Sequence, residues 1–258
     1  MPEFSSYPAG TPSWVDHATK DLAASNRFYA TLFGWDAVDQ GEDMGHYTLY
    51  QKGGRTVAGN MAAMGDQQPC VWTSYVSVDD ADATVAAARA AGATVYAEPM
   101  DVSDLGRMAI LADPTGAVIG IWQPRTFIGA EVANEPGALA WNELNTRDLP
   151  AAKAFYTTVF GWEAHDSDMG GMAYTEWKVG DRSVGGMMAM PDMVPAAVPA
   201  HWLAYFGVAD TDAAVAAATG AGATVMLPAT DIPPGRFAVL ADPDGAAFAI
   251  IAMAPAEG

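Results

Sequence analysis

The sequence of 258 residues has little cysteine, little positive charge and no long apolar run. A single cysteine, Cys70, excludes an intramolecular disulfide bond. Only 12 lysines and arginines stand against 31 aspartates and glutamates, which gives a formal net charge of -19. This balance argues against nucleic-acid binding, which needs clustered cations. No apolar stretch approaches the ~18 residues of a membrane helix, so no membrane partner is expected.

The first residues, 1–7, lack the basic region and apolar run of a secretion signal. We therefore expect a soluble, cytoplasmic protein. Hydrophobic residues make up 51% of the chain and aromatic residues 10%, which is enough for each half of the chain to bury a core of its own.

The most informative feature that is present is a long motif that occurs twice. Trp14-Val-Asp-His-Ala-Thr-Lys-Asp-Leu22 and Phe28-Tyr-Ala-Thr-Leu-Phe-Gly-Trp35 are matched by Trp141-Asn-Glu-Leu-Asn-Thr-Arg-Asp-Leu149 and Phe155-Tyr-Thr-Thr-Val-Phe-Gly-Trp162. Gly-Arg followed by Ala-Asp-Pro-x-Gly occurs at 106–116 and again at 235–245. Two copies, each about half of the chain, indicate a tandem pair of domains rather than a solenoid.

Each half contains two similar units in which a strand and a helix are followed by three strands. In the first unit, 13–18 alternates as a strand does, and Asp21 can cap a helix that Gly34 ends. Asp79 and Asp80 can cap an alanine-rich helix that ends near Gly92. We predict domains at 1–125 and 136–258, joined by a linker at 126–135. The proline, glycine, asparagine and glutamate content of the segment from Pro124 to Pro136 suits an exposed connection.

This unit order and the two repeated signatures resemble the vicinal oxygen chelate superfamily of glyoxalases, bleomycin resistance proteins and extradiol dioxygenases. The Trp-x-Asp or Trp-x-Glu start and the tandem layout are similar to an actinobacterial group of glyoxalase-like proteins. The resemblance covers nearly the whole chain. It implies an α+β fold in which four βαβββ units form two domains with curved mixed sheets around cavities, but such a fold alone does not name a function.

The resemblance also implies positions for a divalent metal, which members with a metal hold through His, Gln or Glu on inner strand positions. In this sequence the implied positions hold Trp14, Gly59, Thr73 and Gly120 in the first half, and Trp141, Gly186, Leu203 and Ala249 in the second. No inherited set of donors remains in either half. We therefore expect no metal ion and no other cofactor.

The four histidines do not replace those donors. His17, His46, His165 and His201 form no short pair such as His-x-His, and surface or hydrogen-bonded core roles suit them better. His17 is also an odd number of residues from Trp14, so strand alternation turns it to the opposite face.

Two carboxylates remain as candidate catalytic residues. Asp16 and Glu143 each follow their tryptophan by two residues and should share its face of the strand. A carboxyl in a concave, apolar sheet would have a raised pKa and could exchange a proton or bind a ligand hydroxyl. The alternative is that both are structural hydrogen-bond acceptors.

Aromatic and methionine side chains near the hairpins are candidates for an adaptable ligand cavity. The candidate ligand-binding residues are Trp14, Trp141, Tyr47, Tyr50, Met61, Trp177 and Met188. Tyr75, Tyr174 and Tyr205 belong to the same aromatic set, of which about half should only pack in the core. Ordinary packing explains most of the methionines equally well.

Two functions remain open. The first is a metal-independent protein that binds an apolar or aromatic small metabolite and either sequesters it or assists its conversion. The alternative is a lyase, isomerase, cyclase or oxygenase with an unorthodox metal site or with Asp16 or Glu143 as acid–base. The sequence does not decide whether the protein is an enzyme, nor whether units pair within or between halves. We expect a monomer, with a homodimer as the alternative.

The two cavities are expected to differ. Asp16, His17 and Leu49 in the first half correspond to Glu143, Leu144 and Glu176 in the second. A carboxylate shifted by one carbon and an additional acid should change ligand preference, so we predict that only one cavity binds the physiological ligand tightly.

Overall fold

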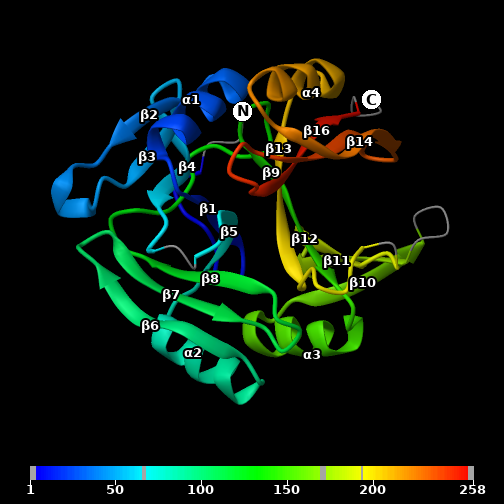
Figure 1. Ribbon diagram of the computed structural model, residues 1–258. Coiled ribbons are helices and arrows are strands. Elements are labelled where there is room, and N and C mark those ends of the chain that lie inside the picture. Colours follow the sequence, from blue (N-terminus) through cyan, green and yellow to red (C-terminus); the bar gives the residue numbers. More distant parts are fainter. Residues whose placement is uncertain (1–3, 66–67, 169–172, 193, 255–258) are drawn as a thin grey trace.

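The computed structural model describes residues 4–65, 68–168, 173–192 and 194–254, and it contains two eight-stranded mixed sheets (Figure 1). The first sheet has the order β2-β3-β4-β1-β5-β8-β7-β6, and the second repeats it as β10-β11-β12-β9-β13-β16-β15-β14. Each sheet therefore uses strands of one half only, and the predicted α+β fold of four βαβββ units is confirmed. Within the described ranges, no helix is long and apolar enough to cross a membrane.

The elements follow the same sequence in every unit. The first half contains β1 (Pro12–Thr19), α1 (Leu22–Phe33), β2 (Asp36–Asp39), β3 (Thr48–Lys52), β4 (Arg55–Ala62), β5 (Val71–Ser77), α2 (Ala81–Ala90), β6 (Thr94–Val102), β7 (Gly106–Ala112) and β8 (Val118–Pro124). The second half contains β9 (Leu139–Thr146), α3 (Leu149–Phe160), β10 (Glu163–Asp168), β11 (Ala173–Val179), β12 (Arg182–Ala189), β13 (His201–Gly207), α4 (Thr211–Gly220), β14 (Thr224–Ile232), β15 (Gly235–Ala241) and β16 (Ala247–Met253). A short 3-10 turn, η1 (Glu42–Met44), precedes β3.

The helix ends agree with their sequence signals. The Asp21 carboxylate accepts a hydrogen bond from the Ala24 amide at 2.9 Å, which satisfies an amide that the first turn of α1 leaves free. Gly34 ends the helix in the left-handed conformation, with φ of 69°, which a residue with a Cβ rarely adopts. The order of elements predicts a strand at the place of edge strand β2, but the sequence does not locate its residues, because all four are exposed and show no apolar alternation.

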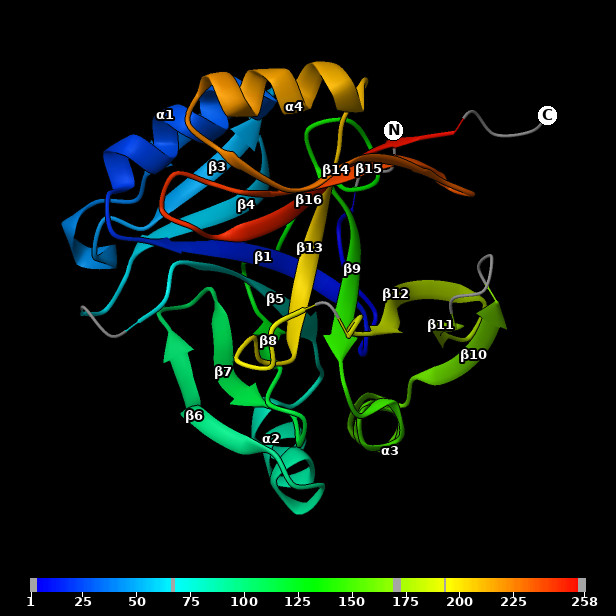
Figure 2. The ribbon, with the colours of Figure 1, turned by 45° about the vertical axis from the view of Figure 1, so that its right-hand side comes forward.

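The helices of the two halves lie side by side. In both views, α1 is next to α4 at the top of the molecule, and α2 is next to α3 at the bottom (Figures 1 and 2). The buried clusters follow this arrangement. One combines Val85 and Ile119 with Phe155 of the second half, and the other combines Phe28 with Phe248. Each half therefore completes the core of the other, although each sheet belongs to one half.

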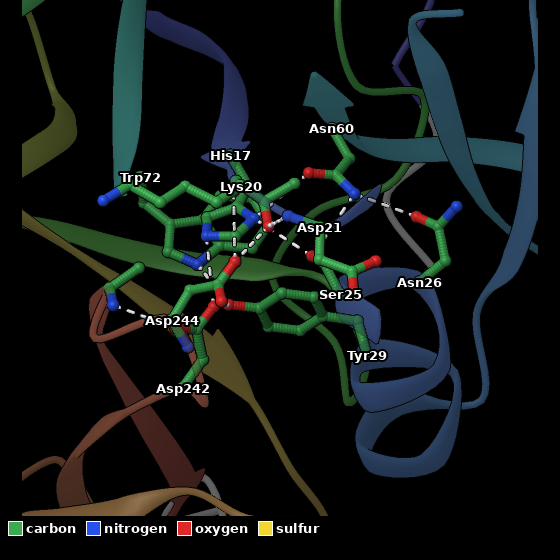
Figure 3. A network of polar contacts seen from close by, with 12 residues as sticks. His17, Lys20, Asp21, Ser25, Asn26, Tyr29, Asn60, Trp72, Asp242 and Asp244 are labelled. Carbon is green, nitrogen blue, oxygen red and sulfur yellow. Dashed lines mark hydrogen bonds and ion pairs between the residues drawn. The ribbon is translucent and has the colours of Figure 1, made fainter. Parts of the chain in front are cut away.

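A polar network crosses this contact between the halves (Figure 3). The Tyr29 hydroxyl donates to Asp242 Oδ2 at 2.9 Å and accepts from Trp72 Nε1 at 2.8 Å. The same arrangement joins Tyr156 to Asp113 and Trp202 at the other end of the contact. The repeated Phe-Tyr and Asp-Pro-x-Gly motifs thus meet in space, and their tyrosines and aspartates join the two halves.

His17 belongs to this network and not to a concave face, as alternation from Trp14 predicted. Its Nε2 lies 3.1 Å from Asp242 Oδ2, although the ring N–H does not point at that oxygen with good hydrogen-bond geometry. Its Nδ1 lies 3.1 Å from both Ser25 Oγ and Asn60 Oδ1. Burial alone would raise the pKa of Asp242, but His17, the Ala246 amide and the Tyr29 hydroxyl together lower it.

Candidate functional site

The concave face of the first sheet carries a closed group of hydrogen-bonded side chains. Asp16 Oδ2 accepts from the Tyr47 hydroxyl at 3.2 Å and from the Tyr75 hydroxyl at 3.1 Å. Trp14 Nε1 donates to the Tyr47 oxygen at 3.0 Å. β1 pairs with both β4 and β5. Its residues Trp14 and Asp16, on the concave face, therefore lie where the two units of this half meet.

Burial dominates the chemistry of Asp16. It raises the pKa of this carboxyl to about 6, against the lowering effects of the Tyr75 and Tyr47 hydroxyls and of His17. The same burial, together with the charge of Asp16, raises the pKa of Tyr47 and Tyr75. The tyrosines therefore act as hydrogen-bond donors at neutral pH.

The second sheet repeats this group with a glutamate. Glu143 Oε1 accepts from the Tyr205 hydroxyl at 2.9 Å, and Trp141 Nε1 donates to the Tyr174 oxygen at 2.8 Å. Burial raises the pKa of Glu143, while the hydroxyls of Tyr205 and Tyr174 and the amide of Asn145 oppose that rise. The two halves thus carry equivalent acid, tyrosine and tryptophan groups.

The second group borders an open cavity. This cavity has a volume of about 320 Å³ and is lined by Ala140, Trp141, Glu143, Ser167, Tyr174, Glu176, Tyr205, Ile232, Pro234, Ile251 and Met253. Its walls are mainly apolar, as in most small-molecule sites. We name it the C-terminal cavity.

The cavity has a second carboxyl, that of Glu176, whose pKa is lowered rather than raised. The Ser183 hydroxyl and then Lys178, whose Nζ lies 3.4 Å from Glu176 Oε2, lower the pKa of Glu176. Glu143 and Glu176 therefore differ in their affinity for a proton although they line one cavity, which is the pattern of carboxyls tuned by their surroundings.

In the first half, an aromatic side chain fills the corresponding space. Phe127 packs edge-on against Trp14 with ring centroids 5.0 Å apart, and against Trp122 at 5.9 Å. Trp14 is only 4% exposed as a result, whereas Trp141 is half-buried and lines the C-terminal cavity.

A larger hollow of about 540 Å³ lies beside the start of β1 and β9. Its lining includes Tyr7, Asn134 and Arg182, and Arg182 is the only charged side chain among the described residues of this lining. Because Arg182 is exposed and none of these lining residues is a buried carboxyl, the C-terminal cavity is the better candidate for binding chemistry.

The residues at the implied metal positions do not fit a divalent ion. An ideal Cβ on Gly59 would lie 2.0 Å from the Tyr47 oxygen, and one on Gly120 would lie 2.2 Å from the Tyr75 ring. Tyrosine rings thus take the space that ligating side chains would need. Among the described residues, no group of three or more His, Cys, Asp or Glu side chains is placed to hold a metal ion.

The structure brings together some of the predicted site residues and separates others. Trp14, Asp16 and Tyr47 form one group, and Trp141 and Glu143 belong to the other. Met61 and Met188 are half-buried, on strands β4 and β12 beside these groups, but neither lines the C-terminal cavity.

Tyr50 and Trp177 lie away from these groups, in the cores between the halves. Tyr50 is fully buried beside Trp35, and its hydroxyl donates to Asn26 Oδ1 at 2.9 Å. Trp177 is fully buried beside Trp162, with ring centroids 5.7 Å apart. Each stands three residues after a cavity tyrosine, so alternation puts it on the other face of its strand.

The sequence contains a signal for Tyr75, Tyr174 and Tyr205, which are not among the candidate ligand-binding residues. Tyr174 follows Trp141 by 33 residues, as the candidate Tyr47 follows Trp14, and Tyr75 and Tyr205 occupy equivalent places in β5 and β13. Phe127 gave no such signal, because it lies in the segment taken as an exposed linker. Arg107 and Arg236, of the repeated Gly-Arg motif, form ion pairs with aspartates.

Replacing Asp16 with asparagine should remove a pH-dependent penalty on folding. The folded pKa of about 6 is above the ordinary value of 3.8, so the folded state binds this proton more tightly and loses stability as pH rises between these values. A shift of about two units corresponds to about 3 kcal/mol. Urea unfolding from pH ~4 to ~7 should show that Asp16→Asn gains stability relative to the wild type by up to that amount. Parallel pH profiles would contradict this assignment.

Comparisons with known proteins agree with the fold. Residues 14–121 match a family model described as a glyoxalase-like domain, and residues 138–250 match that of the Glyoxalase/Bleomycin resistance protein/Dioxygenase superfamily. The chain is 42% identical over 265 residues to "Putative glyoxylase CFP32" of Mycobacterium tuberculosis, with 100% of both chains covered. It is 38% identical to the anthracycline biosynthesis protein DnrV of Streptomyces peucetius, covering 95% of this chain and 94% of that protein.

Among solved structures, the Mn(II)-bound glyoxalase from Novosphingobium aromaticivorans is similar, with a TM-score of 0.66 at 18% sequence identity. The match covers 95% of this chain and 82% of that one. At this level of identity the likeness concerns the fold.

Proposed function

Because the chain belongs to the glyoxalase/bleomycin resistance protein/dioxygenase superfamily, we propose that it uses the cavity of this fold to bind a small aromatic molecule without a metal ion. The ligand is neutral or cationic, carries at least one hydroxyl, and is sequestered or held for conversion. The observation that carries the proposal is the C-terminal cavity of about 320 Å³, with the buried Glu143 in its wall beside Tyr174 and Tyr205.

Size and lining support an aromatic ligand. The volume is near the lower end of small-molecule sites and suits about two or three fused rings. Trp141, Tyr174 and Tyr205 offer ring faces and edges, and Ile251 adds an aliphatic wall. The name of the Streptomyces relative refers to anthracyclines, which are fused-ring aromatic compounds, and this supports the same class of ligand.

The acidic side chains of the cavity limit the charge that the ligand can carry. Glu143 and Glu176 are the carboxylic acids of the lining, and no lysine, arginine or histidine is among the described residues that line the cavity. An anionic ligand would bring a further negative charge beside these acids into a partly apolar space, which is unfavourable. A hydroxyl that donates to Glu143 would instead form a charge-assisted hydrogen bond once this carboxyl is ionised.

The metal-free part of the proposal rests on the donor set. Trp141, Gly186, Leu203 and Ala249 offer no side-chain donor at the positions where the family's ligands are implied. Glu143 alone does not make a site for a divalent ion, because such sites combine several donors.

The experiment is a titration with 2-naphthol, a neutral fused-ring phenol, and with 2-naphthoate as its anionic counterpart. At pH ~8 we expect one 2-naphthol site per chain, much weaker binding of 2-naphthoate, and no effect of a chelator. Glu143→Gln should weaken 2-naphthol binding about tenfold, because a charged acceptor is replaced by a neutral one. Asp16→Asn serves as the matched control and should leave this affinity unchanged, since Phe127 closes off that half.

Several outcomes would overturn the proposal. Equal binding of both probes would contradict the charge argument, and binding that requires Mn²⁺ or Fe²⁺ would contradict the metal-free site. Probe recovered from the complex should be chemically unchanged by mass spectrometry. A new product that disappears in Glu143→Gln would indicate an enzyme that uses this carboxyl as acid–base.

A further inference from the structure

The two halves remain in step until just after the last strand of each sheet and then diverge. The Arg125 amide donates to Leu105 O at 3.0 Å, and the Ala254 amide donates to Pro234 O at 2.9 Å in the same way. Two residues beyond Arg125, the first half has Phe127. The corresponding sequence position in the second half is Ala256, which lies outside the described residues.

Phe127 is fixed in its place by both backbone and ring. Its amide donates to Leu105 O at 3.1 Å, and its carbonyl oxygen accepts from Trp122 Nε1 at 2.9 Å. Its ring meets Trp14 edge-on at 5.0 Å. Such T-shaped contacts are a preferred geometry for aromatic pairs, so the ring binds as an aromatic ligand would.

The second half keeps one partner of this arrangement and lacks the other. Ile251 takes the place of Trp122 in the last strand of the sheet, and Ile251 lines the C-terminal cavity. Trp141, the counterpart of Trp14, is present, half-buried, and lines the same cavity. The acid, tyrosine and tryptophan group is therefore common to both halves, whereas the ring of Phe127 covers it in the first half.

We propose that the first half contains a second, latent aromatic-binding site, which the chain's own Phe127 occupies. The site consists of Trp14, Trp122 and the Asp16–Tyr47–Tyr75 group, and it takes a flat aromatic molecule with a hydroxyl when the phenylalanine ring is absent. The class of ligand rests on the function proposed above, whereas the existence of the occupied site rests on the Phe127 contacts alone.

A ligand could bind here because the first half has the same kinds of binding side chains as the second, and the Phe127 ring takes the space that a ligand would need. Asp16 accepts from two tyrosine hydroxyls through Oδ2 alone, which leaves acceptor capacity on Oδ1. Removing a large aromatic ring from a packed apolar face leaves a cavity that neighbours fill only partly, and such cavities bind small aromatic molecules.

The experiment compares Phe127→Ala with the wild type by calorimetric titration with 2-naphthol, with native mass spectrometry to count bound molecules. The variant should bind one more molecule per chain than the wild type. Adding Asp16→Asn to Phe127→Ala should weaken the additional site about tenfold and leave the other site unchanged. Phe237→Ala is the matched control. It removes a phenylalanine that stacks on Tyr205 at 6.0 Å in the second half, and it should add no site.

The outcomes separate this inference from the proposed function. If the wild type binds one 2-naphthol and Phe127→Ala binds no more, the latent site is refuted and the proposed function stands. If the wild type binds none and Phe127→Ala binds one, the latent site stands and the C-terminal cavity is not the binding site. If Phe127→Ala does not fold, Phe127→Val is measured instead, and an unchanged stoichiometry there refutes the inference.

Discussion

Gly186→Ala should lower the affinity for 2-naphthol by at least tenfold, because the added methyl group displaces the Tyr174 ring that lines the C-terminal cavity. A Cβ on Gly186 would lie 1.8 Å from the Tyr174 oxygen and 2.4 Å from the ring carbon that bears it. The ring must then turn away from β12, which breaks the 2.8 Å bond from Trp141 Nε1 and removes a hydroxyl from beside Glu143. Overpacking of this kind also costs about 1–3 kcal/mol of stability.

Gly220→Ala is the control for this change. Gly220 ends α4, and a Cβ there would meet nothing within 4 Å, so neither affinity nor stability should fall. Calorimetric titration measures affinity, and thermal unfolding of both variants measures stability. Undiminished binding by a folded Gly186→Ala protein would show that Tyr174 does not shape the ligand site.

Trp177→Ala should have the opposite profile, with a large loss of stability and no loss of ligand affinity in the folded protein. The indole is fully buried between the halves, near Trp162 at 5.7 Å and Tyr156 at 5.9 Å. Its Nε1 has no hydrogen-bond partner in the described part of the chain, so the change removes packing there and no hydrogen bond. Deleting such a side chain costs about 3–5 kcal/mol.

Trp141→Ala provides the matched comparison, since it removes the same side chain type from the cavity. This variant should bind 2-naphthol at least tenfold more weakly and lose less stability than Trp177→Ala, because Trp141 is only half-buried. Urea unfolding and probe titration of both proteins check the two effects. A weakened probe affinity in folded Trp177→Ala would contradict this prediction and would indicate that Trp177 contributes to ligand binding.

Features that depend on short-range geometry can be predicted from the amino-acid sequence of this protein. Capping by Asp21, the left-handed end at Gly34 and the order of elements in each unit follow from local backbone preferences. Alternation along one strand placed Trp14 and Asp16 on one face and His17 on the other. The repeat then carried these assignments from the first half to the second, where Trp141 and Glu143 occupy the equivalent positions.

Which strand faces pack against each other depends on contacts between residues far apart in the sequence. Alternation separates Tyr47 from Tyr50, and Tyr174 from Trp177, but it does not say which member faces the cavity, because that depends on strand pairing and on the packing of the other half. The meeting of Tyr29 with Asp242 joins residues 213 positions apart, which no local pattern encodes. Phe127 shows the same limit: its segment has the composition of an exposed linker, and only the folded chain brings its ring onto Trp14 and leaves the other cavity open.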